Sequence, residues 1–296
     1  MITKKHKSIT AGAFLVLCVF LVSGCTADRK KPETTGGDTA RKPVIAVSII
    51  PEETFVKAVC GDLVEIVVML PPGSNPENYE PSPAEMEKFN SASLYFSIGV
   101  PAEENILQNA DNIRTVFLHD KVSAVYPDRK FASGGRDPHI WLSPKRVKVM
   151  IEVIAEEMFA IDAKHGETYR RNAENYIKLL DALDTEIATA FSGLQNRKII
   201  VYHPAFGYFS DDYRLDMYAL EENGKEATAQ RLQQMINFAK EEGIRVVFYQ
   251  EEVDSRQSKA FAEEIHGKTV MLAPLAADYI ENLRLMAVAI MEAEYE

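Results

Sequence analysis

The stretch TYRRNAENYIKLLDALDTEIATAF, residues 168–191, predicts the helix around which the rest of the chain is arranged. It contains no Gly or Pro, and its apolar side chains recur at spacings built from three and four. These side chains are Tyr169, Tyr176, Leu180, Leu183, Ile187 and Phe191. This pattern is typical of one amphipathic helix, roughly 36 Å long at ~1.5 Å per residue. Such a helix is stiff, unlike a Gly/Ser hinge, so we expect it to connect two lobes. An ordinary helix inside one larger domain is the alternative.

Short β-rich runs alternate with helical stretches on both sides of this helix. The expected strands are Val44–Ile49, Val64–Leu70, Leu94–Ile98, Arg114–Leu118, Lys198–Tyr202, Arg245–Tyr249 and Thr269–Leu272. The expected helices are Glu52–Val59, one capped by Ser143-Pro144, Thr228–Glu242, Ser255–His266 and one from Asp278. Strands alternating with helices indicate parallel sheets. We therefore predict an α/β fold of two lobes, each with a mainly parallel sheet and flanking helices. The N-terminal lobe is 43–166, the connecting helix 167–193 and the C-terminal lobe 194–296.

The first residues have the layout of a secretory signal peptide. Three lysines (Lys4, Lys5 and Lys7) precede an apolar run, Ala11–Val22, and the small residues Ser23-Gly24 lead to Cys25. Because the run is shorter than the ~20 residues of a membrane span, we expect a signal peptide at 1–24. An uncleaved anchor helix is the alternative. The placement of Cys25 resembles a bacterial lipobox, which implies a lipidated, extracytoplasmic protein anchored to the cell membrane. Residues 25–42 lack an apolar period and are expected to form a flexible tether.

Charge and cysteine content narrow the class of protein. Without residues 1–24, 30 basic residues stand against 44 acidic ones, a net charge of −14. This balance argues against nucleic-acid binding and fits a surface that concentrates cations. Cys60 is the one cysteine after Cys25, so the exported part has no internal disulfide and depends on its hydrophobic core.

Two histidines stand where a ligand would be held. His139 lies in a loop stiffened by Pro138, just before the predicted helix at Ser143-Pro144. His203 directly follows the strand Lys198–Tyr202, and ligands of parallel sheets collect beyond the carboxyl ends of strands.

Two carboxylates occupy comparable places. Glu77 follows the strand Val64–Leu70, and Asp278 follows Thr269–Leu272. The spacing of these four residues forms no local metal motif. Taken singly, Asp278 has the alternative role of a helix N-cap and His203 that of a satisfied core histidine.

Five segments together resemble the zinc and manganese capture proteins among the solute-binding proteins of ABC transporters. They are PGSNPENYEPSP (72–83), DPHIWLSP (137–144), YHPAFGYF (202–209), EENGKEAT (221–228) and PLAADYI (274–280). The resemblance covers nearly all of residues 43–296. It implies two α/β lobes bridged by a rigid helix, with one metal ion between them. It also implies a monomer that delivers the ion to the membrane permease of an ABC importer, and not an enzyme.

Carried over by position, the ligands of the family fall on Glu77, His139, His203 and Asp278. The residue after Pro76 is usually histidine in this family, whereas this chain has Glu77. Nitrogen ligands suit Zn²⁺, and added oxygens favour harder ions such as Mn²⁺. We favour zinc because it binds more tightly than manganese at nearly any nitrogen and oxygen site. Manganese or iron capture is the alternative. A metal-dependent hydrolase and a surface adhesin are the competing classes.

Overall fold

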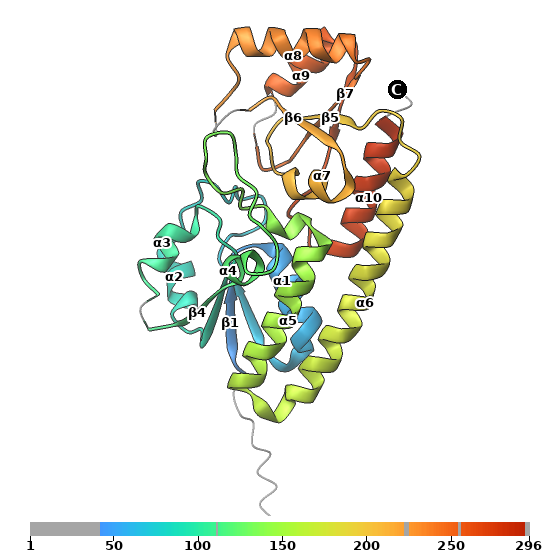
Figure 1. The fold of residues 1–296 in the computed structure, drawn as a ribbon. Helices are drawn as coiled ribbons and strands as arrows, with labels where there is room; N and C mark the ends of the chain where they lie inside the picture. The colour runs from blue at the N-terminus through green and yellow to red at the C-terminus, as the bar shows by residue number, and fades with distance from the viewer. Residues whose placement is uncertain (1–41, 111, 222–224, 254–255, 294–296) are drawn as a thin grey trace, which may run out of the picture. The chain divides into compact units, whose positions relative to one another are not determined.

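Two four-stranded sheets form the framework of the fold, one before the long helix in the sequence and one after it (Figure 1). The computed structural model describes residues 42–110, 112–221, 225–253 and 256–293. Residues 1–41 lie outside these ranges, and with them the predicted signal peptide, Cys25 and nearly all of the tether. The proposals for these segments therefore stay predictions.

The first sheet has the strand order β2-β1-β3-β4, and all of its strands are parallel. The strands are β1 (Val44–Val47), β2 (Glu65–Val68), β3 (Leu94–Ser97) and β4 (Arg114–Phe117). The helices are α1 (Ile50–Cys60), α2 (Pro83–Phe89), α3 (Glu103–Leu107), α4 (Leu118–Ser123) and α5 (Pro144–Ile161), with 3₁₀ turns η1 (Gly61–Leu63), η2 (Ile140–Leu142) and η3 (Ala163–His165). Every residue of β1 and β3 is buried, as expected for the central strands of a covered parallel sheet.

The second sheet repeats this plan with the order β6-β5-β7-β8, again entirely parallel. The strands are β5 (Lys198–Val201), β6 (Asp216–Ala219), β7 (Val246–Tyr249) and β8 (Lys268–Met271). The helices are α7 (Gly207–Tyr213), α8 (Ala229–Glu241), α9 (Arg256–Glu264) and α10 (Tyr279–Glu292). The sequence did not predict β6, an edge strand in which no residue is fully buried. The predicted fold class, two α/β lobes with parallel sheets, is confirmed.

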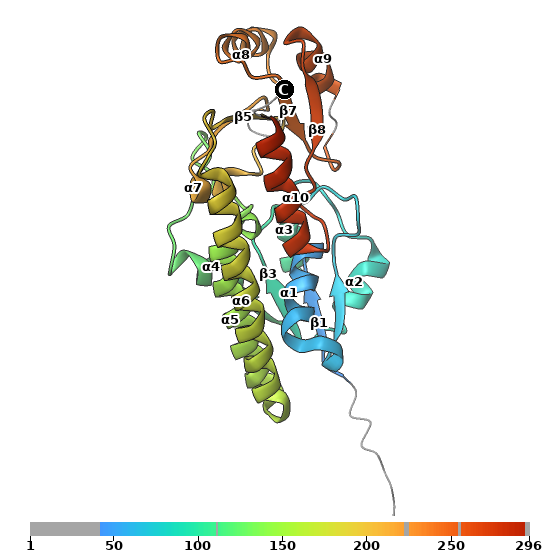
Figure 2. The ribbon, with the colours of Figure 1, turned by 90° about the vertical axis from the view of Figure 1, so that its right-hand side faces the viewer.

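The long helix α6 (Gly166–Phe191) runs the length that its apolar spacing predicts. It packs against α1 and α5 of the first half and against α10 of the second, as Figures 1 and 2 show. Its buried side chains include Tyr169, Leu180 and Phe191, all members of the predicted apolar stripe. Within the described ranges, none of the helices is both long and apolar enough to cross a bilayer.

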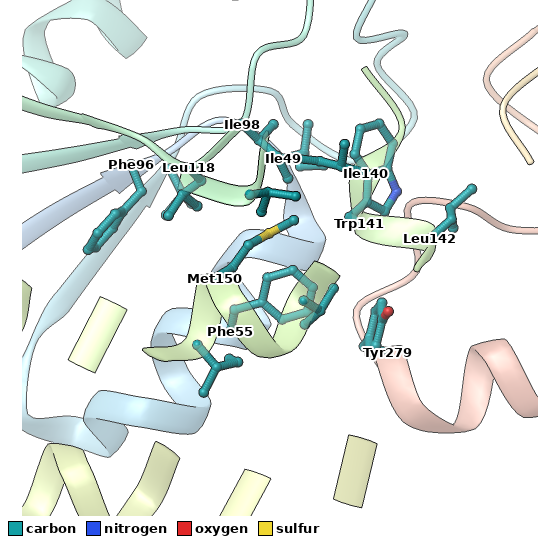
Figure 3. Close-up of a cluster of buried hydrophobic side chains, with 14 of the residues drawn as sticks. Ile49, Phe55, Phe96, Ile98, Leu118, Ile140, Trp141, Leu142, Met150 and Tyr279 are labelled. Carbon is teal, nitrogen blue, oxygen red and sulfur yellow. The ribbon is translucent and has the colours of Figure 1, made fainter. Parts of the chain in front are cut away.

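A continuous hydrophobic core joins the two halves beside α6 (Figure 3). Trp141 lies between Ile140 and Leu142 in this cluster, and its Nε1 donates a 2.9 Å hydrogen bond to the carbonyl of Pro274 in the second half. The ring of Phe55 in α1 meets that of Tyr279 in α10 edge-on, with centroids 5.0 Å apart. The lobes are therefore held together by shared packing as well as by the connecting helix, which limits how far they can separate.

The carboxyl ends of the central strands carry polar residues in both sheets. In the first sheet, Ser48 follows β1 and Ser97 ends β3. In the second, His203 lies two residues beyond β5 and Gln250 directly follows β7. Since the strand order reverses between β1 and β3 and again between β5 and β7, these edges are the switch points at which parallel sheets bind ligands.

Candidate metal centre

Glu77, His139 and His203 converge on one point, although they come from three separate loops. One ligand atom from each lies within 4.8 Å of the others, and they form the one cluster of three or more such residues in the described part of the chain. The Nε2 atoms of His139 and His203 are 3.4 Å apart, and Oε1 of Glu77 is 3.3 Å from Nε2 of His203. Two imidazole nitrogens and a carboxylate oxygen so close together can serve as the donor set of a transition-metal site.

Glu77 is presented by the loop that follows β2. The Asn75 side chain accepts a 2.9 Å hydrogen bond from the backbone N–H of Glu77 and thereby closes a turn. The carbonyl of Pro76 accepts from the N–H of Ala102, which fastens the loop to the region before α3. The Glu77 side chain remains 28% exposed, the most accessible of the three donors.

Asp137 fixes His139 through two hydrogen bonds. One carboxylate oxygen accepts from the backbone N–H of His139 at 3.0 Å and lies 2.8 Å from its Nδ1. This contact leaves Nε2 of His139 for a ligand, because a histidine that donates Nδ1–H to a carboxylate binds metal through the other nitrogen. A glycine is required at position 207, beside Asp137. Any larger residue would place its Cβ 2.5 Å from Oδ2 of Asp137, which is too close for a van der Waals contact.

Glu221 has the matching role for His203. Its Oε2 is 2.9 Å from Nδ1 of His203, and both residues are buried. Burial alone would lower the pKa of His203. The hydrogen bond to Glu221 and the negative charges of Glu77 and Glu221 outweigh it, so the pKa lies above the ordinary value of 6.5. Sequence reasoning missed this role because Glu221 follows β6, the strand that was not predicted.

Asp278, the fourth predicted ligand, does not join this group. Its side chain is exposed and accepts a hydrogen bond from the N–H of Glu281, which makes it the N-cap of α10. The site is instead approached by Pro274 and Leu275, which precede Asp278 in the same loop. In the structure Asp278 takes its alternative role, because an aspartate at this position satisfies the free N–H groups of a helix start.

Two cavities adjoin the donors. A small one, of about 10 Å³, is bordered by all three together with Gln250, Pro274 and Leu275. A larger one, of about 460 Å³, is bordered by Glu77 and His203 along with Glu221, Arg129, Lys130 and Arg231. The small cavity has the size of a single bound ion or water, and the larger one provides room for exchange beside two of the donors.

The family of the protein follows from comparison with known proteins. Residues 45–293 match the ZnuA family, described as the periplasmic component A of a zinc-uptake complex. The chain belongs to this family. ZnuA-family members are metal-binding solute-binding proteins of ABC transporters rather than enzymes, so the resemblance inferred from five motifs is confirmed and the hydrolase alternative falls.

Individual relatives of the ZnuA family carry different metals in their names. MtsA of Streptococcus pyogenes serotype M1, named an iron ABC transporter substrate-binding lipoprotein, is 30% identical over 278 residues, covering 88% of this chain and 86% of MtsA. A crystal structure of ZnuA is 33% identical with a TM-score of 0.81, covering 86% of this chain and 99% of that one. A zinc-bound deletion mutant of ZnuA is 34% identical with a TM-score of 0.80, covering 86% and 98%.

Proposed function

We propose that this protein captures one divalent transition-metal ion outside the cytoplasm, zinc in preference to manganese or iron, and delivers it to the permease of an ABC importer. The observation that carries the proposal is the convergence of Glu77, His139 and His203, each of which places one ligand atom within 4.8 Å of those of the other two. Buried carboxylates orient both histidines, and such contacts strengthen imidazoles as metal ligands.

The preference for zinc rests on the two imidazole nitrogens and on the greater affinity of Zn²⁺ over Mn²⁺ for mixed nitrogen and oxygen sites. The oxygen of Glu77 and the name of the relative MtsA favour the second candidate, capture of iron or manganese. Signal-peptide cleavage at 1–24, anchoring through a lipid on Cys25, and a monomeric state complete the proposal. The lobe boundaries predicted from the sequence are retained in it.

Replacement of Glu77 tests the donor set. We expect the purified, metal-stripped protein to take up one equivalent of zinc from an equimolar mixture of Zn²⁺ and Mn²⁺. Glu77→Ala should weaken zinc binding by roughly a hundredfold, because each of about four donors carries a share of the ~10–16 kcal/mol that zinc binding supplies. Metal content and competition with a chelator of known affinity measure both effects.

Two controls accompany this experiment. Glu80→Ala removes an exposed carboxylate three residues away, and Asp278→Ala removes the predicted ligand that lies elsewhere; neither should alter zinc affinity. Manganese taken up in preference to zinc would refute the proposed selectivity. Equal affinity of Glu77→Ala and the unchanged protein would remove Glu77 from the donor set, and absence of bound metal would refute capture itself.

Zinc affinity should fall as the pH is lowered, and the fall should begin above pH 6.5. Metal binding requires neutral histidines, and the raised pKa of His203 means that a proton competes with the metal at a higher pH than at an ordinary histidine. Below that pKa, each displaced proton costs about tenfold in affinity per pH unit. Chelator competition between pH 8 and pH 5.5 measures the curve, and an affinity independent of pH over this range would contradict direct ligation by His203.

A further inference from the structure

Gln250 is a buried polar residue at the candidate metal centre that no motif pointed to. It directly follows β7, only 6% of its surface is exposed, and it borders the small cavity together with Glu77, His139 and His203. Within the described part of the chain, its side-chain oxygen Oε1 is fully buried and accepts no hydrogen bond. Buried polar atoms almost always have a partner, so an amide oxygen left without one at a ligand site requires an explanation.

The pairing of β5 with β7 places Gln250 beside His203. Val201 is opposite Phe248 in this parallel pair, and the N–H of Tyr202 donates to the carbonyl of Phe248 at 2.8 Å. Continued by two residues, the same register sets His203 alongside Gln250, with both side chains on the same face. Neighbouring strands lie ~4.8 Å apart, and strand order reverses at this pair, so both residues stand at the switch point of the second sheet.

Two other oxygens on the wall of the small cavity already accept hydrogen bonds. The side-chain oxygen of Asn75 accepts from the N–H of Glu77, and the carbonyl of Pro274 accepts from Nε1 of Trp141. Leu275 contributes an apolar side chain. Where the sequence predicted a carboxylate from the loop after β8, the structure thus supplies a hydrophobic wall, and three protein donors leave a coordination position open.

We infer that Gln250 completes the metal site as a fourth protein ligand through its amide oxygen Oε1, and that it tunes which ion is held. This inference deepens the proposed function and rests on it. An amide oxygen is a neutral, hard donor of the kind found in sites for divalent cations. The donor set then contains two imidazoles, one carboxylate and one amide, and Glu77 alone among the four neutralises charge on the ion.

A neutral fourth ligand has a direct consequence for affinity and selectivity. A second carboxylate in this position would attract any divalent cation more strongly and would favour harder ions, such as Mn²⁺, over Zn²⁺. Gln250→Glu keeps the length and shape of the side chain, adds this charge and replaces the NH₂ group by a second oxygen. Compared with a carboxylate, the amide therefore holds the ion less tightly and keeps the site selective for zinc.

The test compares three substitutions in the full protein, using Zn²⁺ and Mn²⁺ separately in chelator competition. Gln250→Ala should lower zinc affinity by roughly tenfold. Gln250→Glu should raise the affinity for Mn²⁺ at least several-fold more than that for Zn²⁺. Gln233→Ala, at an exposed position of α8, should change neither. Because Oε1 has no hydrogen-bond partner to lose, Gln250→Ala should lower the Tm of the metal-free protein only by the packing that it removes, and it should reduce the increase of Tm that zinc produces by a larger amount.

The outcomes separate this inference from the proposed function. One outcome is that the unchanged protein binds zinc while both Gln250 variants bind Zn²⁺ and Mn²⁺ with unchanged affinity. In that case Gln250 is not a ligand, although the proposal of metal capture stands. A loss of Tm in metal-free Gln250→Ala as large as the loss in its zinc-bound form, with the two metals affected equally by Gln250→Glu, would assign a structural role instead. If the unchanged protein binds no metal, the proposed function fails together with the inference.

Discussion

His139→Ala is expected to weaken zinc binding by roughly a hundred- to a thousandfold. Binding free energies of zinc in protein sites, ~10–16 kcal/mol, are shared among about four donors, so each donor contributes about 3–4 kcal/mol. The substitution also deprives the buried carboxylate of Asp137 of the Nδ1 partner, although the backbone N–H at position 139 still donates to it. Isothermal titration at pH 7.5, with chelator competition for the tight-binding protein, measures the loss.

Replacement of a histidine far from the cluster serves as the control for His139→Ala. His266 is exposed and has a left-handed backbone, φ 56°, which asparagine tolerates well. His266→Asn should therefore bind zinc like the unchanged protein and keep its stability. If His139→Ala bound zinc within a few-fold of the unchanged protein, the cluster of Glu77, His139 and His203 would not be the site of capture.

Most of the fold could be predicted from the sequence because its signals are local. The apolar stripe of α6 follows from the helical period alone, and the buried strands β1 and β3 are continuous apolar runs. β6 could not be found in this way. Its four residues, Asp216–Ala219, contain no β-branched side chain and are partly exposed, and the strand exists because its backbone pairs with β5.

The candidate site was predictable only in part, because the sequence carries local signals but does not show which distant residues meet. His203 and Glu77 follow recognisable strands, and His139 lies in a stiff loop, so the switch-point rule locates them. That rule also applies to Gln250, which directly follows the predicted strand Arg245–Tyr249, but an amide is not among the residues that spacing arguments single out as metal ligands. Asp278 lies outside the cluster and caps α10, a role that an aspartate directly before a helix fulfils and that the sequence offered as its alternative.

A second strong effect is expected at a buried pair of carboxyl groups near the carboxyl edge of the first sheet. Glu103 accepts hydrogen bonds from the hydroxyls of Ser48 and Ser97 and from the N–H groups of Ile98 and Gly99. Four donors directed at one carboxylate stabilise its ionised form. Burial raises the pKa of Glu103 as well, but these four donors oppose the rise, so Glu103 rather than Glu52 is the member of the pair that carries the negative charge.

Glu52, the other member, is held neutral. It is fully buried, and its Oε2 accepts hydrogen bonds from the N–H groups of Ser48 and Ile49 at 2.9 and 3.1 Å. Burial, followed by the charge of Glu103, raises the pKa of Glu52 well above its ordinary value of 4.5. Ser48 links the two groups, because its N–H donates to Glu52 and its hydroxyl donates to Glu103.

Opposite changes in stability should follow when each carboxyl group is replaced by an amide. Glu103→Gln should lower the free energy of unfolding by about 3 kcal/mol, because an NH₂ group would face donors and leave a buried N–H unpaired. Glu52→Gln should raise it by roughly 1–2 kcal/mol at pH 7, because an amide keeps the acceptor for two N–H groups and has no proton to lose. Urea unfolding of the metal-free protein measures both.

The dependence on pH distinguishes this account from a simple packing effect. Below pH 4.5, Glu52 is protonated in both the folded and the unfolded states, and it contributes no pH dependence. As the pH rises through 4.5, the unfolded chain loses the proton while the folded protein keeps it, so the folded state binds more protons and stability falls. The advantage of Glu52→Gln should thus be present at pH 7 and vanish near pH 4. An advantage that is constant across this range, or a loss of stability in Glu52→Gln equal to that in Glu103→Gln, would show that Glu52 is not the protonated member of the pair.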